Sequence, residues 1–99
     1  NVRNGDYALA IDDFTKAISI NPNHLNSYFN RGLAYIEQQD YEKAIEDFTT
    51  SISLNPNYKL AFKNRALTKN LIGDDYCSDY QKACELGDKF SCGRYKDCR

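Results

Sequence analysis

Hydrophobic residues along this chain recur three or four positions apart, which is the spacing of one face of an α-helix. Polar and charged residues fill the positions between them, so each helix is expected to bury one face and expose the other. The strict alternation that marks a half-buried β-strand is absent. The clearest stripes are Ala10, Phe14, Ala17 and Ile18; Tyr28, Gly32, Tyr35 and Ile36; and Ala44, Ile45, Phe48 and Ile52. The pattern predicts an all-α protein.

The stripes belong to a repeat of 34 residues, because moving the sequence by that distance places Asn21-Pro22-Asn23 on Asn55-Pro56-Asn57. Proline lacks a backbone donor and clashes with a preceding helical turn, so each Asn-Pro-Asn is expected to end a helix. The other matching positions are Asp6, Tyr7, Ala10, Ile11, Asp13, Phe14, Thr15, Ile18 and Ser19, which fall on Asp40, Tyr41, Ala44, Ile45, Asp47, Phe48, Thr49, Ile52 and Ser53. Each unit is predicted to be a helix, a short turn and a second helix.

The middle unit, residues 25–58, resembles a tetratricopeptide repeat. The matching large, small and turn positions are Tyr28, Gly32, Tyr35, Ala44, Phe48 and Pro56. Arg31 stands where the family usually has leucine, and Ser51 where it usually has alanine. The resemblance implies a right-handed α-solenoid of antiparallel helix pairs, in which the small residues let paired helices approach closely.

The chain is expected to form a single tetratricopeptide-like domain, residues 1–99, of about two and a half repeats plus a C-terminal helix. The parts are the second helix of a truncated repeat (1–24), a complete repeat (25–58), a divergent repeat (59–86) and a C-terminal capping helix (87–99). In the divergent repeat, Tyr80 and Ala83 match the aromatic and small positions if two residues are deleted.

The first helix of the truncated repeat is expected to be cut away, so that this sequence is a piece from the C-terminal end of a larger array. Ile11, Phe14 and Ile18 would then lack a partner helix. Repeat arrays normally cover such an end with a polar cap. We therefore expect the N-terminal face to self-associate or to fray.

All four cysteines lie near the C-terminus, and the segment 82–92 is similar to the cysteine-rich branch of Sel1-like repeats. That resemblance implies a disulfide between Cys84 and Cys92, which would join one helix to the next. In an antiparallel hairpin, the residue numbers of two facing positions add up to a nearly constant sum. Cys77 with Cys98 gives nearly the same sum as Cys84 with Cys92, so both pairs centre on the Gly87-Asp88 turn. Cα atoms must come within about 7 Å to be bridged, which favours Cys84 with Cys92 over the outer pair.

Two alternatives to disulfides stay open for these cysteines. In the first, the cysteines are buried free thiols, and the protein would then be expected in the cytoplasm. Bridged cysteines would instead indicate a periplasmic or secreted protein. Structural zinc is the other, but the gaps of six, seven and five residues differ from the close pairs typical of zinc sites, so no metal is expected.

Composition argues against several classes of function. The 13 Lys and Arg residues do not exceed the 14 Asp and Glu residues, so nucleic acid is not expected as a partner. No apolar stretch approaches the roughly 20 residues of a membrane-spanning helix. The single histidine, His24, lies in a predicted turn, and Asp12, Asp13, Glu46 and Asp47 are interpreted as solvated helix faces. We expect neither catalysis nor a cofactor.

The tetratricopeptide resemblance implies a concave groove, lined by the first helix of each unit, that binds another polypeptide. Family members often use an asparagine at the positions of Asn30 and Asn64 to hydrogen-bond a peptide backbone. Leu60 and Asn64 stand where a clamp for a terminal carboxylate would need cations, so that specificity is not expected. The expected peptide-binding residues are Asn26, Phe29, Asn30, Leu33, Lys63, Asn64 and Leu67, with Glu37, Asn70 and Leu71 also facing the groove.

Two other functions remain as alternatives to a peptide-binding scaffold. The first is a structural array that self-assembles without a dedicated peptide ligand. The second, a more distant one, is an enzyme of the cysteine-rich Sel1-like kind. Solvation of Asn30 and Asn64 on an unused polar face would favour the first alternative.

Overall fold

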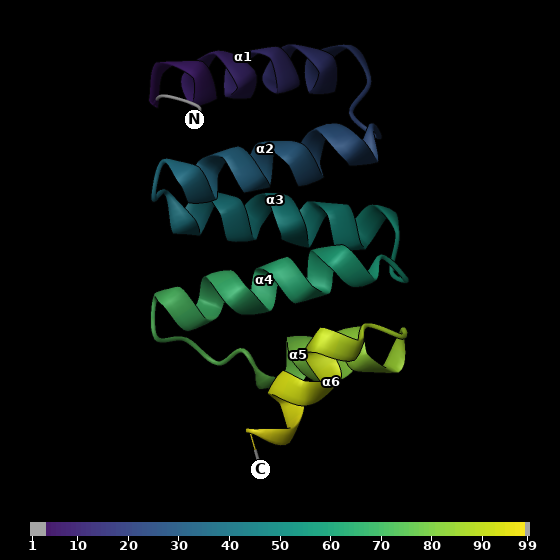
Figure 1. Cartoon of the computed structure of the whole chain (residues 1–99). Coiled ribbons are helices and arrows are strands. Elements are labelled where there is room, and N and C mark those ends of the chain that lie inside the picture. Colours follow the sequence, from purple (N-terminus) through teal and green to yellow (C-terminus); the bar gives the residue numbers. More distant parts are fainter. Residues whose placement is uncertain (1–3, 99) are drawn as a thin grey trace.

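The computed structural model describes residues 4–98, and within that range every regular element is an α-helix. The helices are α1 (Asn4–Ile20), α2 (Leu25–Glu37), α3 (Tyr41–Leu54), α4 (Lys59–Leu71), α5 (Cys77–Glu85) and α6 (Lys89–Lys96). Each helix packs against the next along the chain (Figure 1). The all-α helical-repeat solenoid expected from the sequence is confirmed.

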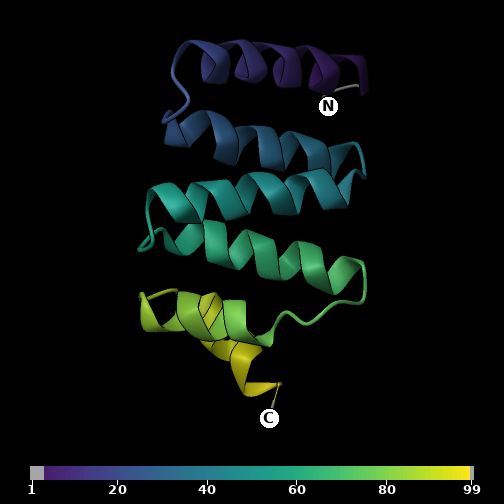
Figure 2. The same cartoon turned by 180° about the vertical axis from the view of Figure 1, so that it is seen from behind.

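The helices form an elongated stack of 40 × 26 × 21 Å, with α1 at one end and the α5–α6 pair at the other (Figure 2). Successive helices reverse direction through short turns. Asn21 Oδ1 accepts the N–H of Asn23 at 3.1 Å, and Asn55 Oδ1 accepts that of Asn57 at 3.1 Å. The two Asn-Pro-Asn joints therefore close with the same side-chain turn. In the described residues, no helix is both long and apolar enough for a bilayer crossing.

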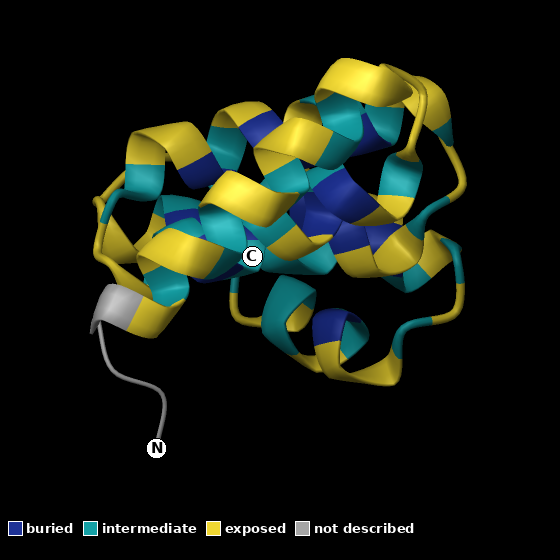
Figure 3. Ribbon diagram, turned by 90° about the horizontal axis from the view of Figure 1, so that it is seen from above, coloured by how far each residue is buried: buried dark blue, intermediate teal, exposed yellow. Residues whose placement is uncertain are grey.

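The hydrophobic core lies where α2, α3 and α4 meet. Ala44, Phe48 and Ala61 are fully buried there, and Phe29 contacts the Phe48 ring at a centroid distance of 5.7 Å. Buried positions lie between neighbouring helices, whereas the outward faces are exposed (Figure 3). The hydrophobic stripes of α2 and α3 pack in or against this core, whereas the stripe of α1 is only partly covered.

The pair α4–α5 repeats this packing with a shorter second helix, since α5 has 9 residues and α3 has 14. Tyr80 and Ala83 have no exposed surface, and they take the positions that Phe48 and Ser51 hold in the preceding unit. The two residues that this unit lacks are therefore missing between the end of α4 and the buried positions of α5. The inward-facing positions of α5 are kept.

Two disulfides join α5 and α6: Cys84 with Cys92, and Cys77 with Cys98. Their Cα atoms lie 4.5 Å and 5.9 Å apart, respectively. The inner bridge is the one favoured from the sequence, and the outer pair is bridged as well because α6 folds back across α5. Gly87 has a φ of +104°, a conformation that would strain a residue with a side chain. Glycine at this position therefore allows the chain to reverse direction between α5 and α6.

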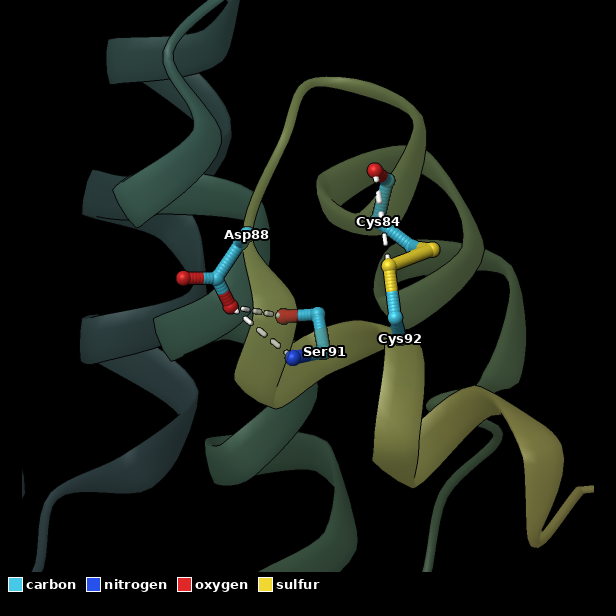
Figure 4. Close-up of a disulfide and its surroundings, with 4 residues drawn as sticks. All are labelled: Cys84, Asp88, Ser91 and Cys92. Atoms are coloured by element: carbon cyan, nitrogen blue, oxygen red, sulfur yellow. Dashed lines mark hydrogen bonds between the residues drawn. A yellow bond between two sulfur atoms is a disulfide. The ribbon is translucent and has the colours of Figure 1, made fainter.

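Asp88 begins α6 by capping its first turn. Its Oδ2 accepts the backbone N–H of Ser91 at 3.0 Å and the Ser91 hydroxyl at 2.5 Å (Figure 4). The adjacent Cys84–Cys92 bridge holds the same turn from the other side. A helix of 8 residues is marginal alone, so the cap and the bridges account for its place in the fold.

Candidate functional site

A groove of about 660 Å³ runs along the side of the stack where α1, α2 and α4 meet. Its walls are mainly apolar, with three asparagines and one glutamate among them. The lining residues are Tyr7, Ala10 and Phe14 of α1; Asn30, Leu33, Ala34, Ile36 and Glu37 of α2; and Leu67, Thr68, Asn70, Leu71 and Asn64 of α4. An apolar cleft with a few polar groups is typical of a ligand site.

Four of the seven residues expected from the sequence lie together in this groove: Asn30, Leu33, Asn64 and Leu67. Glu37, Asn70 and Leu71, which were also expected to face it, do so. They come together because α2 and α4 are related by the 34-residue repeat, so equivalent side chains point the same way.

The two asparagines differ in their hydrogen bonding. Asn64 Nδ2 donates to the carbonyl oxygen of Leu60 at 2.8 Å, one turn earlier in the same helix. Asn30 is exposed, and its side chain has no hydrogen bond to any residue in the described range 4–98. Asn30 therefore offers both a donor and an acceptor to a ligand, whereas Asn64 offers chiefly its carbonyl oxygen.

The other three expected residues do not line the groove. Phe29 is only 9% exposed and packs in the core against Phe48 and Tyr58, so its assignment to the groove surface is corrected. Lys63 extends over the Phe90 ring at 5.0 Å, toward α6. Asn26 is exposed on α2 outside the lining. Phe29 was misplaced because its helix has hydrophobic residues on two faces, and the core takes one of them.

Helix α1 contributes a wall of the groove that was not expected from the sequence. Tyr7 Oη donates to Glu37 Oε2 at 3.4 Å and so links α1 to the end of α2. The pKa of the Tyr7 phenol is raised, first by partial desolvation and then by the negative charge of Glu37 and the hydrogen bond to it. The repeat gave no signal for this wall, because the matching α3 residues Tyr41, Ala44 and Phe48 do not line the groove.

Two ion pairs, each with a buried carboxylate and a partly exposed arginine, connect neighbouring helices. Arg31 Nε and Nη2 donate to the two carboxylate oxygens of Asp47 at 2.8 and 2.7 Å, and Arg31 Nη1 donates to Thr15 Oγ1 at 3.1 Å. The next unit repeats the arrangement with Arg65, Asp79 and Thr49, at 2.8, 2.7 and 3.1 Å. Each arginine thus joins its own unit to the unit before it.

The pairing with Arg31 corrects the interpretation of Asp47 as a solvated residue, because Asp47 is only 4% exposed. It also explains the arginine at a position where the family usually has leucine. The pKa of Arg31 is raised, chiefly by its hydrogen bond to Asp47 and against the effect of desolvation. Arg31 and Arg65, like Thr15 and Thr49, recur at the repeat distance of 34 residues. Asp47 and Asp79 are 32 residues apart, as expected from the two residues missing in the divergent repeat.

Comparisons with known proteins agree with this architecture. Residues 26–58 match a family model described as tetratricopeptide repeat, and residues 2–39 match another described as TPR repeat. No curated protein sequence matches the chain significantly. The structural comparison, in contrast, finds many similar solved domains.

Three solved structures illustrate the similarity. The second TPR of Spaghetti (RPAP3), bound to the HSP90 peptide SRMEEVD, is 30% identical with a TM-score of 0.78, over 83% of this chain and 78% of that one. The second TPR domain of human RPAP3, in complex with the HSP70 peptide SGPTIEEVD, is 28% identical with a TM-score of 0.84, over 94% and 81%. MamA protein is 29% identical with a TM-score of 0.78, over 82% of this chain and 45% of its own.

Proposed function

Because this chain belongs to the tetratricopeptide repeat family, we propose that it is a protein-interaction scaffold that binds a segment of another polypeptide in its groove. The observation that carries the proposal is the apolar groove between α1, α2 and α4, with the free side-chain amide of Asn30 in its wall. Leu33 and Leu67 would receive apolar side chains of the partner. Asn30 and Asn64 would hydrogen-bond its backbone.

The charge of the groove distinguishes the proposed partner from the peptides in the similar structures. Those peptides, SRMEEVD and SGPTIEEVD, both end in Glu-Glu-Val-Asp. The lining of the present groove contains no Lys, Arg or His among the described residues, and it contains Glu37. A carboxylate would therefore meet no cation and one like charge. The proposed partner is an apolar segment without acidic residues.

Selection from a random peptide library would test this proposal. We expect the selected peptides to be rich in apolar residues, and the acidic peptide SRMEEVD to bind poorly. The double variant N30A/N64A should bind a selected peptide about 30-fold more weakly, since two hydrogen bonds contribute about 1 kcal/mol each. Its oligomeric state, measured by analytical ultracentrifugation, should not change.

The matched control is N23A/N57A, which makes the same change at equivalent exposed positions in the two joints. It should bind the selected peptide as the unchanged protein does. Equal effects of the two double variants would contradict a groove site. If no peptide is selected, and a groove substitution alters only self-association, the structural-array alternative is correct.

A further inference from the structure

Two apolar side chains at the end of α4 are exposed, although described helices lie on both sides of α4 in the stack. Leu71 is 59% exposed and Ile72 is 42% exposed. The equivalent residues one repeat earlier, Glu37 and Gln38, are polar. Leu71 also lines the groove between α1, α2 and α4. The apolar surface of the groove therefore continues to the end of α4.

A second hollow, of about 450 Å³, lies beside Ile72 at the start of α3. The end of α4 and the turn between α2 and α3 lie on the same side of the stack (Figure 1). We call this second space the turn hollow, and its lining residues are Gln39, Asp40, Tyr41, Glu42, Lys43, Glu46 and Ile72. Because Leu71 lines the groove and Ile72 lines the turn hollow, the two spaces meet at adjacent residues.

The lining of the turn hollow carries more negative than positive charge. Asp40, Glu42 and Glu46 contribute three carboxylates to it. The cation among the lining residues is Lys43, whose Nζ lies 3.7 Å from Asp40 Oδ2 and 5.7 Å from the centroid of the Tyr35 ring. Glu42 and Glu46 form no ion pair with any residue in the range 4–98. Lys43 therefore serves Asp40 and leaves the two glutamates without a counter-charge.

Glu42 and Glu46 lie four residues apart in α3, so their side chains share one face of the helix. Like charges at this spacing repel each other, and a cation placed between them is attracted by both. Both glutamates are exposed, so a partner reaches them without breaking a contact. A lysine or arginine side chain has the complementary charge, and its aliphatic stem can pack on an apolar surface such as Ile72.

We propose that the polypeptide bound in the groove carries a lysine or arginine next to its apolar residues, and that this basic residue lies in the turn hollow. Apolar side chains of the partner contact Leu67 and Leu71. Its chain then passes over Ile72, and the basic head group lies between Glu42 and Glu46. This inference deepens the proposed function, because it rests on the same groove and adds the charge of the residue that flanks the bound apolar segment.

The probes are the peptides that the random library selects on the unchanged protein. We expect them to carry lysine or arginine at one end of their apolar run. Replacing that residue by acetyl-lysine or citrulline, which are neutral and similar in shape, should weaken binding about fivefold, the upper range for an exposed ion pair. Fluorescence anisotropy measures the affinity of each peptide.

The variant E42Q/E46Q removes the two unpaired charges and keeps the size of both side chains. It should bind the basic peptide about fivefold more weakly, and the neutral peptide as the unchanged protein does. The matched control D12N/E85Q removes two charges from exposed residues outside the turn hollow, and it should alter binding by less than about twofold. Urea unfolding should show no loss of stability in E42Q/E46Q, because the two glutamates repel each other.

A second variant tests the path between the groove and the turn hollow. I72Q gives position 72 the residue that the preceding unit has at the equivalent position, Gln38. It should weaken both the basic and the neutral peptide about threefold, because the partner loses an apolar contact. The control L54Q makes the same change at an exposed apolar residue outside both spaces, and it should bind as the unchanged protein does.

The other outcomes separate this inference from the proposed function. Selected peptides without a basic residue, or equal effects of E42Q/E46Q and D12N/E85Q, would overturn the inference. The proposed function stands in that case if binding still depends on Asn30 and Asn64. If the protein is a dimer that E42Q/E46Q dissociates, the occupant is a second copy and the inference is wrong. If no peptide is selected, the proposed function is wrong and the inference fails with it.

Discussion

Gly32 of α2 and Phe48 of α3 pack so closely that a Cβ atom on Gly32 would lie 2.8 Å from the Phe48 ring. Phe48 has no exposed surface, so its ring has no solvent-filled space into which to move. The close approach of α2 and α3 thus depends on the absence of one methyl group. In the next unit, where the partner of the small residue is Tyr80, alanine occupies the equivalent position.

The first prediction is that G32A destabilises the protein by about 1–3 kcal/mol, the usual cost of overpacking a core, although alanine favours the helix. Urea unfolding measures the change. The control is G93A on α6, where no heavy atom lies within 4 Å of the added methyl group. That variant should be slightly more stable than the unchanged protein. A G32A variant as stable as G93A would contradict the close contact.

The second prediction concerns the Arg31–Asp47 pair, whose side chains are 18% and 6% exposed. Removing one partner of a buried pair leaves an uncompensated charge, so R31L should cost about 3 kcal/mol of unfolding free energy. The double variant R31L/D47L should lose much less than the sum of the single changes. Equilibrium unfolding of all three variants completes the double-mutant cycle.

The control for that cycle is the exposed pair of Lys43 with Asp40, at 3.7 Å and with side chains 61% and 40% exposed. K43A should change stability by less than about 1 kcal/mol, because solvent screens such pairs. Equal costs for K43A and R31L would show that burial of the arginine pair has no energetic consequence.

The third prediction concerns the two disulfides between α5 and α6. In the chain-entropy model, opening the Cys84–Cys92 loop by substituting both cysteines with serine should cost about 2.5 kcal/mol. Opening Cys77–Cys98, which closes a longer loop, should cost about 3 kcal/mol. Hydrogen exchange should show the loss of protection in α5 and α6 before α2 and α3. Intact mass of the protein purified from an oxidising compartment should rise by four hydrogens on reduction.

The fourth prediction is a dependence of stability on pH that involves Asp88. Desolvation is the largest single influence on its pKa and acts to raise it. The hydrogen bonds from Ser91 and the charges of Lys63 and Lys59 together outweigh it, so the pKa is lowered. The folded protein therefore holds the carboxylate ionised more strongly than the unfolded chain does. This stabilisation is present above the unfolded value near 4 and is lost as pH falls through the lower folded value.

Replacing Asp88 by alanine should cost about 1 kcal/mol at neutral pH, since the α6 cap is lost. The difference in unfolding free energy between D88A and the unchanged protein should shrink as pH falls below about 4. Urea unfolding at several pH values measures both effects. A difference that is constant down to pH 2 would contradict an ionised cap.

Much of the groove was predictable because it follows from local sequence. Asn30, Leu33, Asn64 and Leu67 lie one repeat apart on matching helix faces, so they had to point the same way once α2 and α4 formed. Phe29 was misassigned because periodicity does not say which of two hydrophobic faces meets the core.

The sequence by itself determined the helices, their order and the joints between them, because helical periodicity and the Asn-Pro-Asn turns are local properties of the chain. It also carries an acidic-aromatic pair at the matching position of each second helix, as Asp13-Phe14, Asp47-Phe48 and Asp79-Tyr80. Only the tertiary structure decided that Asp47-Phe48 and Asp79-Tyr80 are buried, with each aspartate paired to an arginine of the preceding helix. The physical reason is that burial depends on which distant segment packs on a helix face, and identical local sequences do not specify their neighbours.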